Sequence, residues 1–241
     1  MAERRTALVT GANKGIGREI ARRLLQLNYS VWIGCRDRDR GEVAVSELRE
    51  TGDARLLLID VADDASVMAA AQSLARETDR LDVLVNNAGV ATGFRTPPSE
   101  ETVAGMKPLY EINVFGPVRT TQAFLPLLKA STAPRIVMMS SGLASLTAAV
   151  DPASEFHAIN LLSYNSSKTA LNAITVAFAK ELEPLGFKVN AADPGYTATD
   201  LNGNTGYRTV EQAAEVAVHL ATFDEHGPTA GFFSDRGAVA W

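Results

Sequence analysis

The chain has 241 residues, 46% of them hydrophobic and 21% charged, and 23 Lys and Arg against 28 Asp and Glu give a formal net charge of −5. This balance is typical of a globular protein and lacks the cationic surface of a nucleic-acid binder, while a single cysteine, Cys35, excludes an intramolecular disulfide and a cysteine-built zinc site. The three histidines show no metal-ligand spacing, no apolar window is long enough for a membrane span, and the start at Met1–Arg5 is too acidic for a secretory signal, so we expect a soluble, cytoplasmic protein.

Short β-branched or aliphatic runs alternate with longer Ala- and Leu-rich stretches along the whole chain. In order, the predicted strands are Thr6–Thr10, Ser30–Cys35, Arg55–Ile59, Val83–Asn86, Arg135–Ser140, Lys188–Ala192 and Gly231–Ser234. The predicted helices are Gly15–Leu27, Gly41–Thr51, Asp64–Thr78, Glu101–Ala130, Leu162–Pro184 and Val210–Phe223. Strands that are apolar on both faces are typical of a parallel sheet covered by helices on both sides. The alternation therefore predicts an α/β fold, a single doubly wound domain over residues 1–241 with a mostly parallel, seven-stranded sheet.

A glycine-rich turn, Thr10-Gly11-Ala12-Asn13-Lys14-Gly15-Ile16-Gly17, follows the first predicted strand. Glycines allow a tight strand-to-helix turn, and they let a pyrophosphate approach the backbone N–H groups at the helix N-terminus. The spacing Gly-x-x-x-Gly-x-Gly is one residue off the usual dinucleotide fingerprint and lacks the ending of a P-loop. Taken by itself, the pattern is also compatible with a turn that holds no ligand.

Further motifs follow the other predicted elements. In chain order they are Asp60-Val61, Asn86-Asn87-Ala88-Gly89, Asn113-Val114-Phe115-Gly116, Ser140-Ser141, Tyr164-Asn165-Ser166-Ser167-Lys168 and Pro194-Gly195-Tyr196-Thr197-Ala198-Thr199-Asp200. With these motifs in this order over essentially its whole length, the chain resembles the short-chain dehydrogenase/reductase family. The resemblance implies a Rossmann-type sheet and a hydride transfer between a nicotinamide cofactor and a carbonyl or alcohol.

The end of the second predicted strand bears on the choice between NAD and NADP. In a dinucleotide fold an acidic residue there favours a free 2′-hydroxyl, whereas a basic one accommodates a 2′-phosphate. Cys35 stands where NAD-preferring family members usually carry a carboxylate, and Arg36 follows it, with Lys14 able to reach the same phosphate. The prediction is therefore NADP(H). Arg38 and Arg40 are interpreted as part of a solvated charge run.

The resemblance implies the remaining cofactor contacts. Asp60 is expected near the adenine ring, Thr199 is expected to contact the nicotinamide, and Asn86 is assigned to the strand end instead of the ligand. The predicted cofactor-binding residues are Gly11, Asn13, Lys14, Gly15, Ile16, Gly17, Arg36, Asp60, Val61, Asn87, Ala88, Gly89, Tyr164, Lys168, Pro194, Gly195, Thr197 and Thr199. No metal ligand is predicted.

Tyr164 and Lys168 are four residues apart, which places them on one face of a helix. An ammonium beside a phenol favours the phenolate and is expected to lower its pKa toward working pH. The resemblance makes Tyr164 the proton donor, Lys168 its partner at the nicotinamide ribose, and Ser141 rather than Ser140 the group that polarises the carbonyl. Asn113 completes the predicted catalytic set, and because Asn is unfavourable inside helices it indicates a helix irregularity there.

Between Ser141 and Tyr164 lie 22 residues, about ten more than in most family members. The extra segment, within Gly142–Leu162, resembles a shortened form of the insertion in monomeric carbonyl reductases, so the oligomeric state stays open. His157 within it is interpreted as a surface residue. The loop Asp200–Thr209 is expected to border the substrate.

These features predict an NADPH-dependent carbonyl reductase, or the reverse alcohol dehydrogenase, that acts on a small to medium ketone or aldehyde. The expected partner is a small-molecule substrate, with no nucleic acid and no membrane. The first alternative is a dinucleotide-binding sensor that performs no turnover, which the presence of both Tyr164 and Lys168 disfavours. The second is an epimerase or dehydratase with tightly held cofactor, which is disfavoured by the short region after Thr199.

Overall fold

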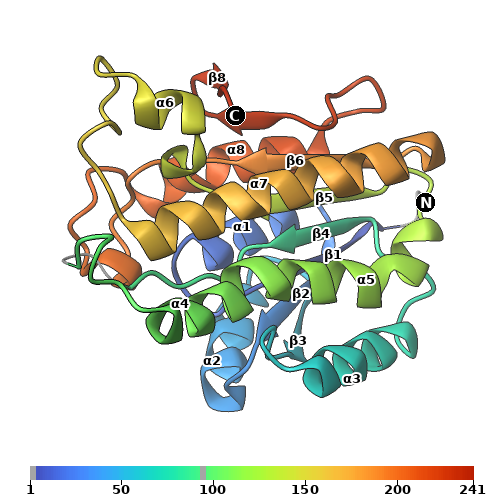
Figure 1. Cartoon of the computed structure of the whole chain (residues 1–241). Helices are drawn as coiled ribbons and strands as arrows, with labels where there is room; N and C mark the ends of the chain where they lie inside the picture. Colours follow the sequence, from blue (N-terminus) through green and yellow to red (C-terminus); the bar gives the residue numbers. More distant parts are fainter. Residues whose placement is uncertain (1–3, 93–95) are drawn as a thin grey trace.

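The computed structural model describes residues 4–92 and 96–241. The first three residues of the start at Met1–Arg5, where no secretory signal is expected, therefore lie outside the described residues. Its strands are β1 (Thr6–Thr10), β2 (Ser30–Cys35), β3 (Ala54–Leu58), β4 (Val83–Asn86), β5 (Arg135–Met139), β6 (Lys188–Ala192), β7 (Phe232–Ser234) and β8 (Gly237–Ala238). They form one sheet in the order β3-β2-β1-β4-β5-β6-β7-β8 (Figure 1). The pairs from β3 through β7 are parallel, which confirms the predicted doubly wound fold.

The eighth strand corrects the predicted count of seven. β8 pairs antiparallel with β7 across a tight hairpin, and Gly237 at its start has a φ of +106°, a conformation that glycine adopts without strain. A two-residue strand carries too short an apolar pattern for periodicity to detect.

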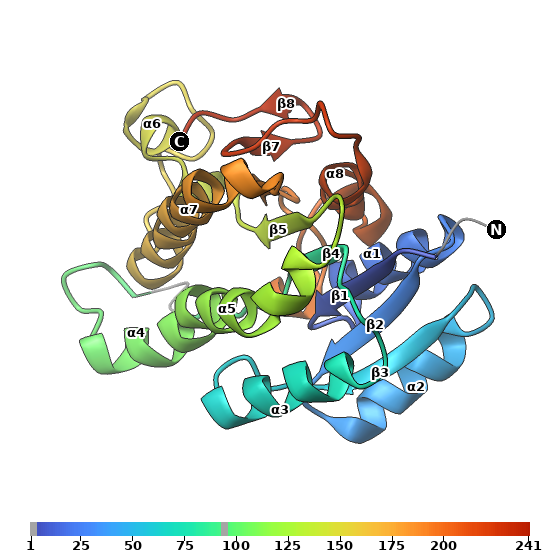
Figure 2. The same ribbon diagram turned by 90° about the vertical axis from the view of Figure 1, so that its right-hand side faces the viewer.

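The helices are α1 (Gly15–Gln26), α2 (Arg38–Leu48), α3 (Asp64–Ala75), α4 (Val103–Tyr110), α5 (Gly116–Lys129), α6 (Leu146–Val150), α7 (Leu162–Leu182) and α8 (Val210–Thr222). Successive side chains of a strand point to opposite faces of the sheet, so Ala7 and Val9 of β1 pack into one core cluster with residues of α1, α2 and α8. Leu8 packs on the other face with residues of α3, α5 and α7. Figure 2 shows these two helical layers on either side of the sheet.

Two helices begin at aspartate caps. The side chain of Asp63 accepts a hydrogen bond from the backbone N of Ser66 at 2.6 Å, as expected for the start of α3. Asp37 accepts in the same way from the backbone N of Arg40 at 3.0 Å. α2 therefore begins at Arg38, three residues before the predicted start at Gly41.

The predicted long helix over 101–130 is interrupted. A π-helical turn, Glu111–Phe115, separates α4 from α5 and contains Asn113. The Asn113 amide bonds to the backbone of Val90 outside the helix, with Oδ1 accepting from Val90 N at 2.9 Å and Nδ2 donating to Val90 O at 2.8 Å. The irregularity expected from the asparagine is thus confirmed, because π-turns mark places where a side chain leaves the regular ladder.

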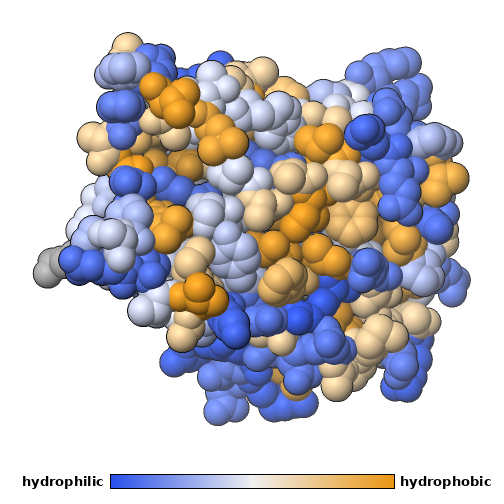
Figure 3. Space-filling model, viewed as in Figure 1, coloured by the Kyte–Doolittle hydropathy of each residue, from blue (hydrophilic) through white to orange (hydrophobic). Residues whose placement is uncertain are grey.

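The segment between Ser141 and α7 is ordered by its own short helices and is not a plain loop. A 3₁₀ turn, Gly142–Ala144, leads into α6, whose Thr147 donates from N and Oγ1 to the backbone O of Trp241 at 3.1 and 2.8 Å. Figure 2 shows α6 beside the end of the chain. His157 is exposed, as predicted. In Figure 3, hydrophobic surface gathers over α7, while the surface around α2 is hydrophilic.

Candidate active site

The predicted site residues meet at one edge of the sheet. The carboxyl ends of parallel strands lie at the same edge, and β1, β4, β5 and β6 are consecutive neighbours. The glycine-rich turn follows β1, Asn87–Gly89 follows β4, Ser141 follows β5 and Pro194–Gly195 follows β6. The strand order reverses beside β1, and ligands of doubly wound sheets bind at such a switch point.

The glycine-rich turn packs directly on the loop after β4. Gly11 has a φ of +64°, and a Cβ built on it would lie 2.9 Å from Ala88 Cα. A Cβ on Gly17 would lie 2.6 Å from Gly11 O, so neither position accepts a side chain. Asn87 Nδ2 donates to Thr10 O at 2.9 Å and to Gly11 O at 3.2 Å. The Asn87 amide, predicted to lie beside the ribose, therefore holds the shape of the turn.

The N-terminus of α1 is suited to an anion. No side chain caps it, because its N-cap residue is Lys14, which leaves the first backbone N–H groups without a side-chain acceptor. Outside the neighbouring residues and the backbone of α1, the one atom of the described residues that a Cβ at Gly15 would meet within 4 Å is Thr199 Cγ2, at 3.8 Å. Unpartnered N–H groups and the helix dipole together fit the pyrophosphate of a dinucleotide.

The end of β2 presents one unpaired cation. Arg36 is exposed and has no hydrogen bond or ion pair with any residue in the described ranges 4–92 and 96–241. Arg38 pairs with Glu42 at 3.4 Å, as expected of a solvated charge run. Lys14, predicted to share the 2′-phosphate with Arg36, instead forms an ion pair with Asp200 of the substrate loop, with 2.7 Å between Nζ and Oδ2.

The two serines after β5 have different roles. Ser140 is buried and donates to Asn172 Oδ1 at 2.6 Å, which ties β5 to α7. Ser141 accepts from Leu143 N at 3.3 Å, and its side chain lies near enough to the Tyr164 phenol to favour the ionised form and so to lower the pKa of that phenol. The structure therefore brings Ser141, and not Ser140, to Tyr164, as the resemblance implied.

Tyr164 and Lys168 lie on one face of α7, with Lys168 Nζ 5.9 Å from the centre of the Tyr164 ring. Burial raises the pKa of Tyr164 to about 12, the nearby Ser141 side chain opposes this rise, and the charge of Asp193 adds to it. Lys168 Nζ donates to Met139 O at 2.7 Å, and burial lowers its pKa to about 8. The sequence predicted that Lys168 would lower the pKa of the Tyr164 phenol, but this pKa is raised. Burial of the phenol is the largest effect on its pKa, and the Lys168 ammonium donates its hydrogen bond to Met139 O instead.

Asn113 joins this cluster from the π-turn. It is 0% exposed, and its Nδ2 also donates to Ser167 Oγ of α7 at 3.2 Å. A Cβ on Gly89 would lie 3.4 Å from Asn113 Oδ1 and 3.6 Å from Lys168 Nζ. Gly89 therefore leaves room for both polar groups next to each other.

The turn after β6 contains a charged residue that the sequence did not single out. Asp193 is 9% exposed, and its Oδ1 accepts from Gly195 N at 2.9 Å. Burial raises the pKa of the Asp193 carboxyl. The only signal for it in the sequence was an Asp before Pro-Gly, which is typical of an ordinary turn. At Thr197 the chain forms a bridge to Arg208, which closes the loop between them.

Within the part of the chain that the structure describes, no helix is long and apolar enough to cross a membrane. The same described residues contain no group of three or more His, Cys, Asp or Glu side chains that could hold a metal ion.

A family model described as short chain dehydrogenase matches residues 5–209. The (+)-neomenthol dehydrogenase of Arabidopsis thaliana is 33% identical over 98% of this chain and 97% of its own. The (−)-isopiperitenone reductase of Mentha piperita is 33% identical over 100% of this chain and 99% of its own. The structure of an NADPH-bound carbonyl reductase from chicken fatty liver matches with a TM-score of 0.87 at 29% identity, covering 99% of this chain and 100% of that one. The chain thus belongs to the short-chain dehydrogenase/reductase family, as an oxidoreductase that acts on CH–OH or carbonyl groups.

Proposed function

We propose that the protein is an NADPH-dependent carbonyl reductase that also runs in reverse as an alcohol dehydrogenase, with Tyr164 as general acid and base. The observation that carries this proposal is the proximity of the Ser141 side chain to the Tyr164 phenol at the sheet edge that also bears the N-terminus of α1, which no side chain of the described residues caps. A hydroxyl pair of this kind suits a carbonyl oxygen, which accepts one hydrogen bond from each group.

The preference for NADPH rests on Arg36. An unpaired guanidinium at the end of β2 can hold a phosphate through two parallel hydrogen bonds, and Cys35 supplies no carboxylate for a 2′-hydroxyl. The similar structure from chicken fatty liver is a carbonyl reductase with NADPH bound, which supports this choice. When bound, the cofactor supplies the hydride.

The residues of the chain supply binding and the proton. Backbone N–H groups at Gly15–Gly17 would hold the pyrophosphate, and Lys168 would reach the ribose of the nicotinamide half. A phenol whose pKa is about 12 keeps its proton at neutral pH, so Tyr164 stands ready to donate to the carbonyl oxygen as negative charge develops there. Ser141 orients the same oxygen.

The test follows NADPH absorbance against a panel of ketones, aldehydes and quinones. The panel includes isopiperitenone, the ketone after which one of the two plant relatives is named. With a responsive substrate, Tyr164→Phe is expected to lower kcat by about 10²- to 10⁴-fold, the range for a lost general acid. Tyr110→Phe is the matched control, because its hydroxyl bonds to Ser166 on the same helix but not to Ser141. Full activity of Tyr164→Phe on every responsive substrate would refute the assignment.

The two alternatives give different results in the same assay. A sensor would bind NADPH and consume none with any carbonyl of the panel. An epimerase or dehydratase with tightly held cofactor would convert substrate without net consumption of added NADPH. Stoichiometric oxidation of NADPH with alcohol formation excludes both.

A further inference from the structure

A buried carboxyl group connects two turns of the site. Asp193 Oδ1 accepts from the backbone N of Gly195 at 2.9 Å, and Asp193 Oδ2 lies against Gly142. A Cβ built on Gly142 would lie 3.0 Å from Asp193 Oδ2, so the contact requires a glycine or a shift of the carboxylate. Gly142 directly follows Ser141, and Gly195 belongs to the turn expected at the nicotinamide.

The same carboxyl acts on the proton donor. The charge of Asp193 raises the pKa of Tyr164, in addition to the larger effect of burial. Asp193 also donates its backbone N to Phe233 O at 2.7 Å, which fixes it to β7. The group is therefore held at both its backbone and its side chain, close to Ser141 and Tyr164.

The positive charge that faces Asp193 comes from the substrate loop. Arg208 lowers the pKa of Asp193, its Nη1 pairs with Asp235 Oδ2 at 2.6 Å, and its Cδ would lie 2.6 Å from a Cβ on Gly195. Its Nε is buried without a hydrogen-bond partner among the described residues. Through its backbone, Arg208 donates to Tyr196 O at 3.1 Å and so closes the base of the loop.

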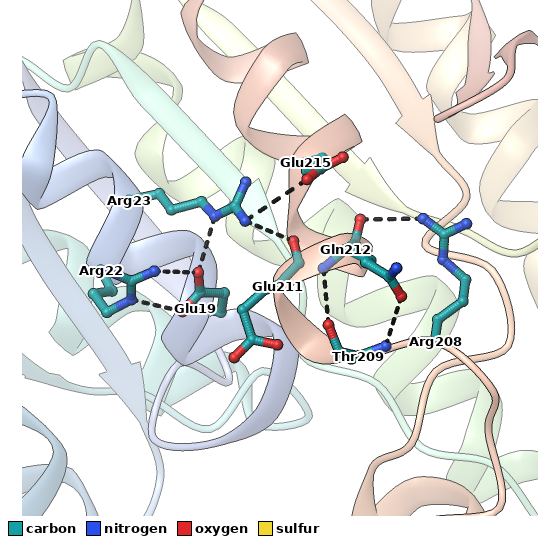
Figure 4. A network of polar contacts seen from close by, with 8 residues as sticks. All are labelled: Glu19, Arg22, Arg23, Arg208, Thr209, Glu211, Gln212 and Glu215. Carbon is teal, nitrogen blue, oxygen red and sulfur yellow. Dashed lines mark hydrogen bonds and ion pairs between the residues drawn. The ribbon is translucent and has the colours of Figure 1, made fainter.

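The position of Arg208 is fixed by a polar network shown in Figure 4. Its Nη2 donates to Gln212 O at 3.2 Å, and Thr209 and Gln212 form a capping box at the start of α8. Arg23 of α1 donates to Glu211 O of α8 at 2.8 Å. The Arg208 side chain is thus held by α8, which is itself hydrogen-bonded to α1, although the loop that carries Arg208 lies on the surface.

We propose that Asp193 is a positioning residue for the reduction: its carboxylate joins the Ser141–Gly142 turn to the Pro194–Gly195 turn and holds the Ser141 hydroxyl against Tyr164 when the cofactor is in place. Arg208 is the counter-charge that keeps this carboxylate in its buried position. The inference rests on the proposed function, because it assigns Asp193 a role in the reaction of Ser141 and Tyr164.

The charged and titratable groups around Asp193 set the sign of a pH effect. They are Tyr164 from α7, Arg208 before α8 and Asp235 between β7 and β8. A negative charge at Asp193 disfavours the phenolate, so its removal eases the ionisation of Tyr164. Reduction requires the protonated phenol, and the alkaline limb of kcat against pH is therefore expected to move to lower pH without this charge.

The experiment measures kcat and KM for ketone reduction across the pH range in wild type, Asp193→Asn and Asp193→Glu, with Tm measured for each. Asp193→Asn replaces one acceptor oxygen by an NH₂ group and removes the charge. We expect kcat to fall by about tenfold or more, because small displacements of catalytic groups are costly. KM for NADPH should stay within about twofold of wild type, and the alkaline limb should move to lower pH.

Asp193→Glu keeps the charge and displaces the carboxylate by one methylene, so kcat should fall while the alkaline limb stays in place. Asp235→Asn is the matched control, because it removes a carboxylate beside Arg208 that touches neither turn, and its kcat should stay within about twofold of wild type. If Asp193→Asn does not fold, Asp193→Glu decides the question by its kcat.

A kcat within twofold of wild type in Asp193→Asn or Asp193→Glu would overturn the inference. A fall of kcat in Asp193→Asn without movement of the alkaline limb would overturn it as well. These results are distinct from failure of the proposed function, which would appear as full activity of Tyr164→Phe.

Discussion

The buried ammonium of Lys168 allows a prediction about stability that is independent of any substrate. Lys168 is 6% exposed, and burial lowers its pKa from 10.5 to about 8. At about 1.36 kcal/mol per pKa unit, the difference corresponds to about 3 kcal/mol of destabilisation when the folded chain holds this ammonium charged at neutral pH. The hydrogen bond to Met139 O offsets about 1 kcal/mol of such a cost in a typical protein.

The perturbation is Lys168→Met, which keeps an unbranched side chain of similar length and removes the charge. The variant loses the stabilising hydrogen bond to Met139 O. It also no longer buries an ammonium charge, which removes the larger destabilising contribution. We therefore expect the free energy of unfolding at pH 7 to rise by about 2 kcal/mol while reductase activity is lost. Stabilisation at the expense of activity is common at sites that hold a charge in a buried position.

The pH dependence follows from proton binding. Between pH 8 and 10.5 the unfolded chain binds a proton at Lys168 that the folded chain has released, so the stability of the wild type rises with pH in this window. The advantage of Lys168→Met should therefore shrink by about 2 kcal/mol between about pH 7 and about pH 9.5. Both values lie below the ordinary pKa of a phenol, so Tyr164 stays protonated in both states.

The assay is urea unfolding of the cofactor-free protein at both pH values for wild type and Lys168→Met. Lys180→Met is the matched control, because Lys180 lies on the same helix and is exposed. Its difference from wild type should not change with pH. An equal stability difference between wild type and Lys168→Met at the two pH values would refute the reasoning, since it would show that burial does not destabilise the Lys168 ammonium.

Two predictions concern the cofactor. Arg36→Ala should raise the Kd for NADPH by about 10- to 100-fold, the value of a lost charge-assisted contact, and leave the Kd for NADH within about twofold, as measured by fluorescence titration. Arg38→Ala is its control, and equal losses for both cofactors would contradict a 2′-phosphate contact. Asp200→Asn should lower the Kd for NADPH by a few-fold and not that for NADH, because it releases Lys14 from its ion pair; an unchanged ratio of the two Kd values would show that Lys14 does not reach the phosphate.

Signals within short stretches of sequence predicted most of the secondary structure. Each of the seven predicted strands is present to within one residue at either end, because strands buried on both faces are apolar runs bounded by polar or glycine residues. Helix ends were less accurate, and α2 starts at Arg38 because the cap is Asp37. The π-turn at Asn113 was expected because an asparagine inside a helix conflicts with its own propensity.

The sequence motifs predicted the chemistry of the site only in part. The motifs identified Ser141, Tyr164 and Lys168, and the structure brings them together. The direction of the Tyr164 pKa was wrong, because desolvation depends on every segment packed around the phenol and not on the spacing to one lysine. Asp193 was missed because its importance comes from contacts with two glycines, Gly142 and Gly195, of which only Gly195 is near in sequence.

The order of strands and helices along the chain and the tight glycine turn were determined by the sequence itself, since they depend on side-chain periodicity and on glycine conformations. The candidate reacting groups were indicated by the resemblance of the motifs to those of the family. The tertiary structure decided which charges meet. Lys14 and Asp200 are 186 positions apart, and their ion pair follows from the loop after β6 lying beside the turn after β1. Electrostatic interactions weaken with distance in space, and the burial of a side chain depends on which segments pack around it. Ion pairs between segments that are remote in sequence, and the pKa values that depend on such contacts, therefore arise only when the folded sheet has brought its strand ends to one edge.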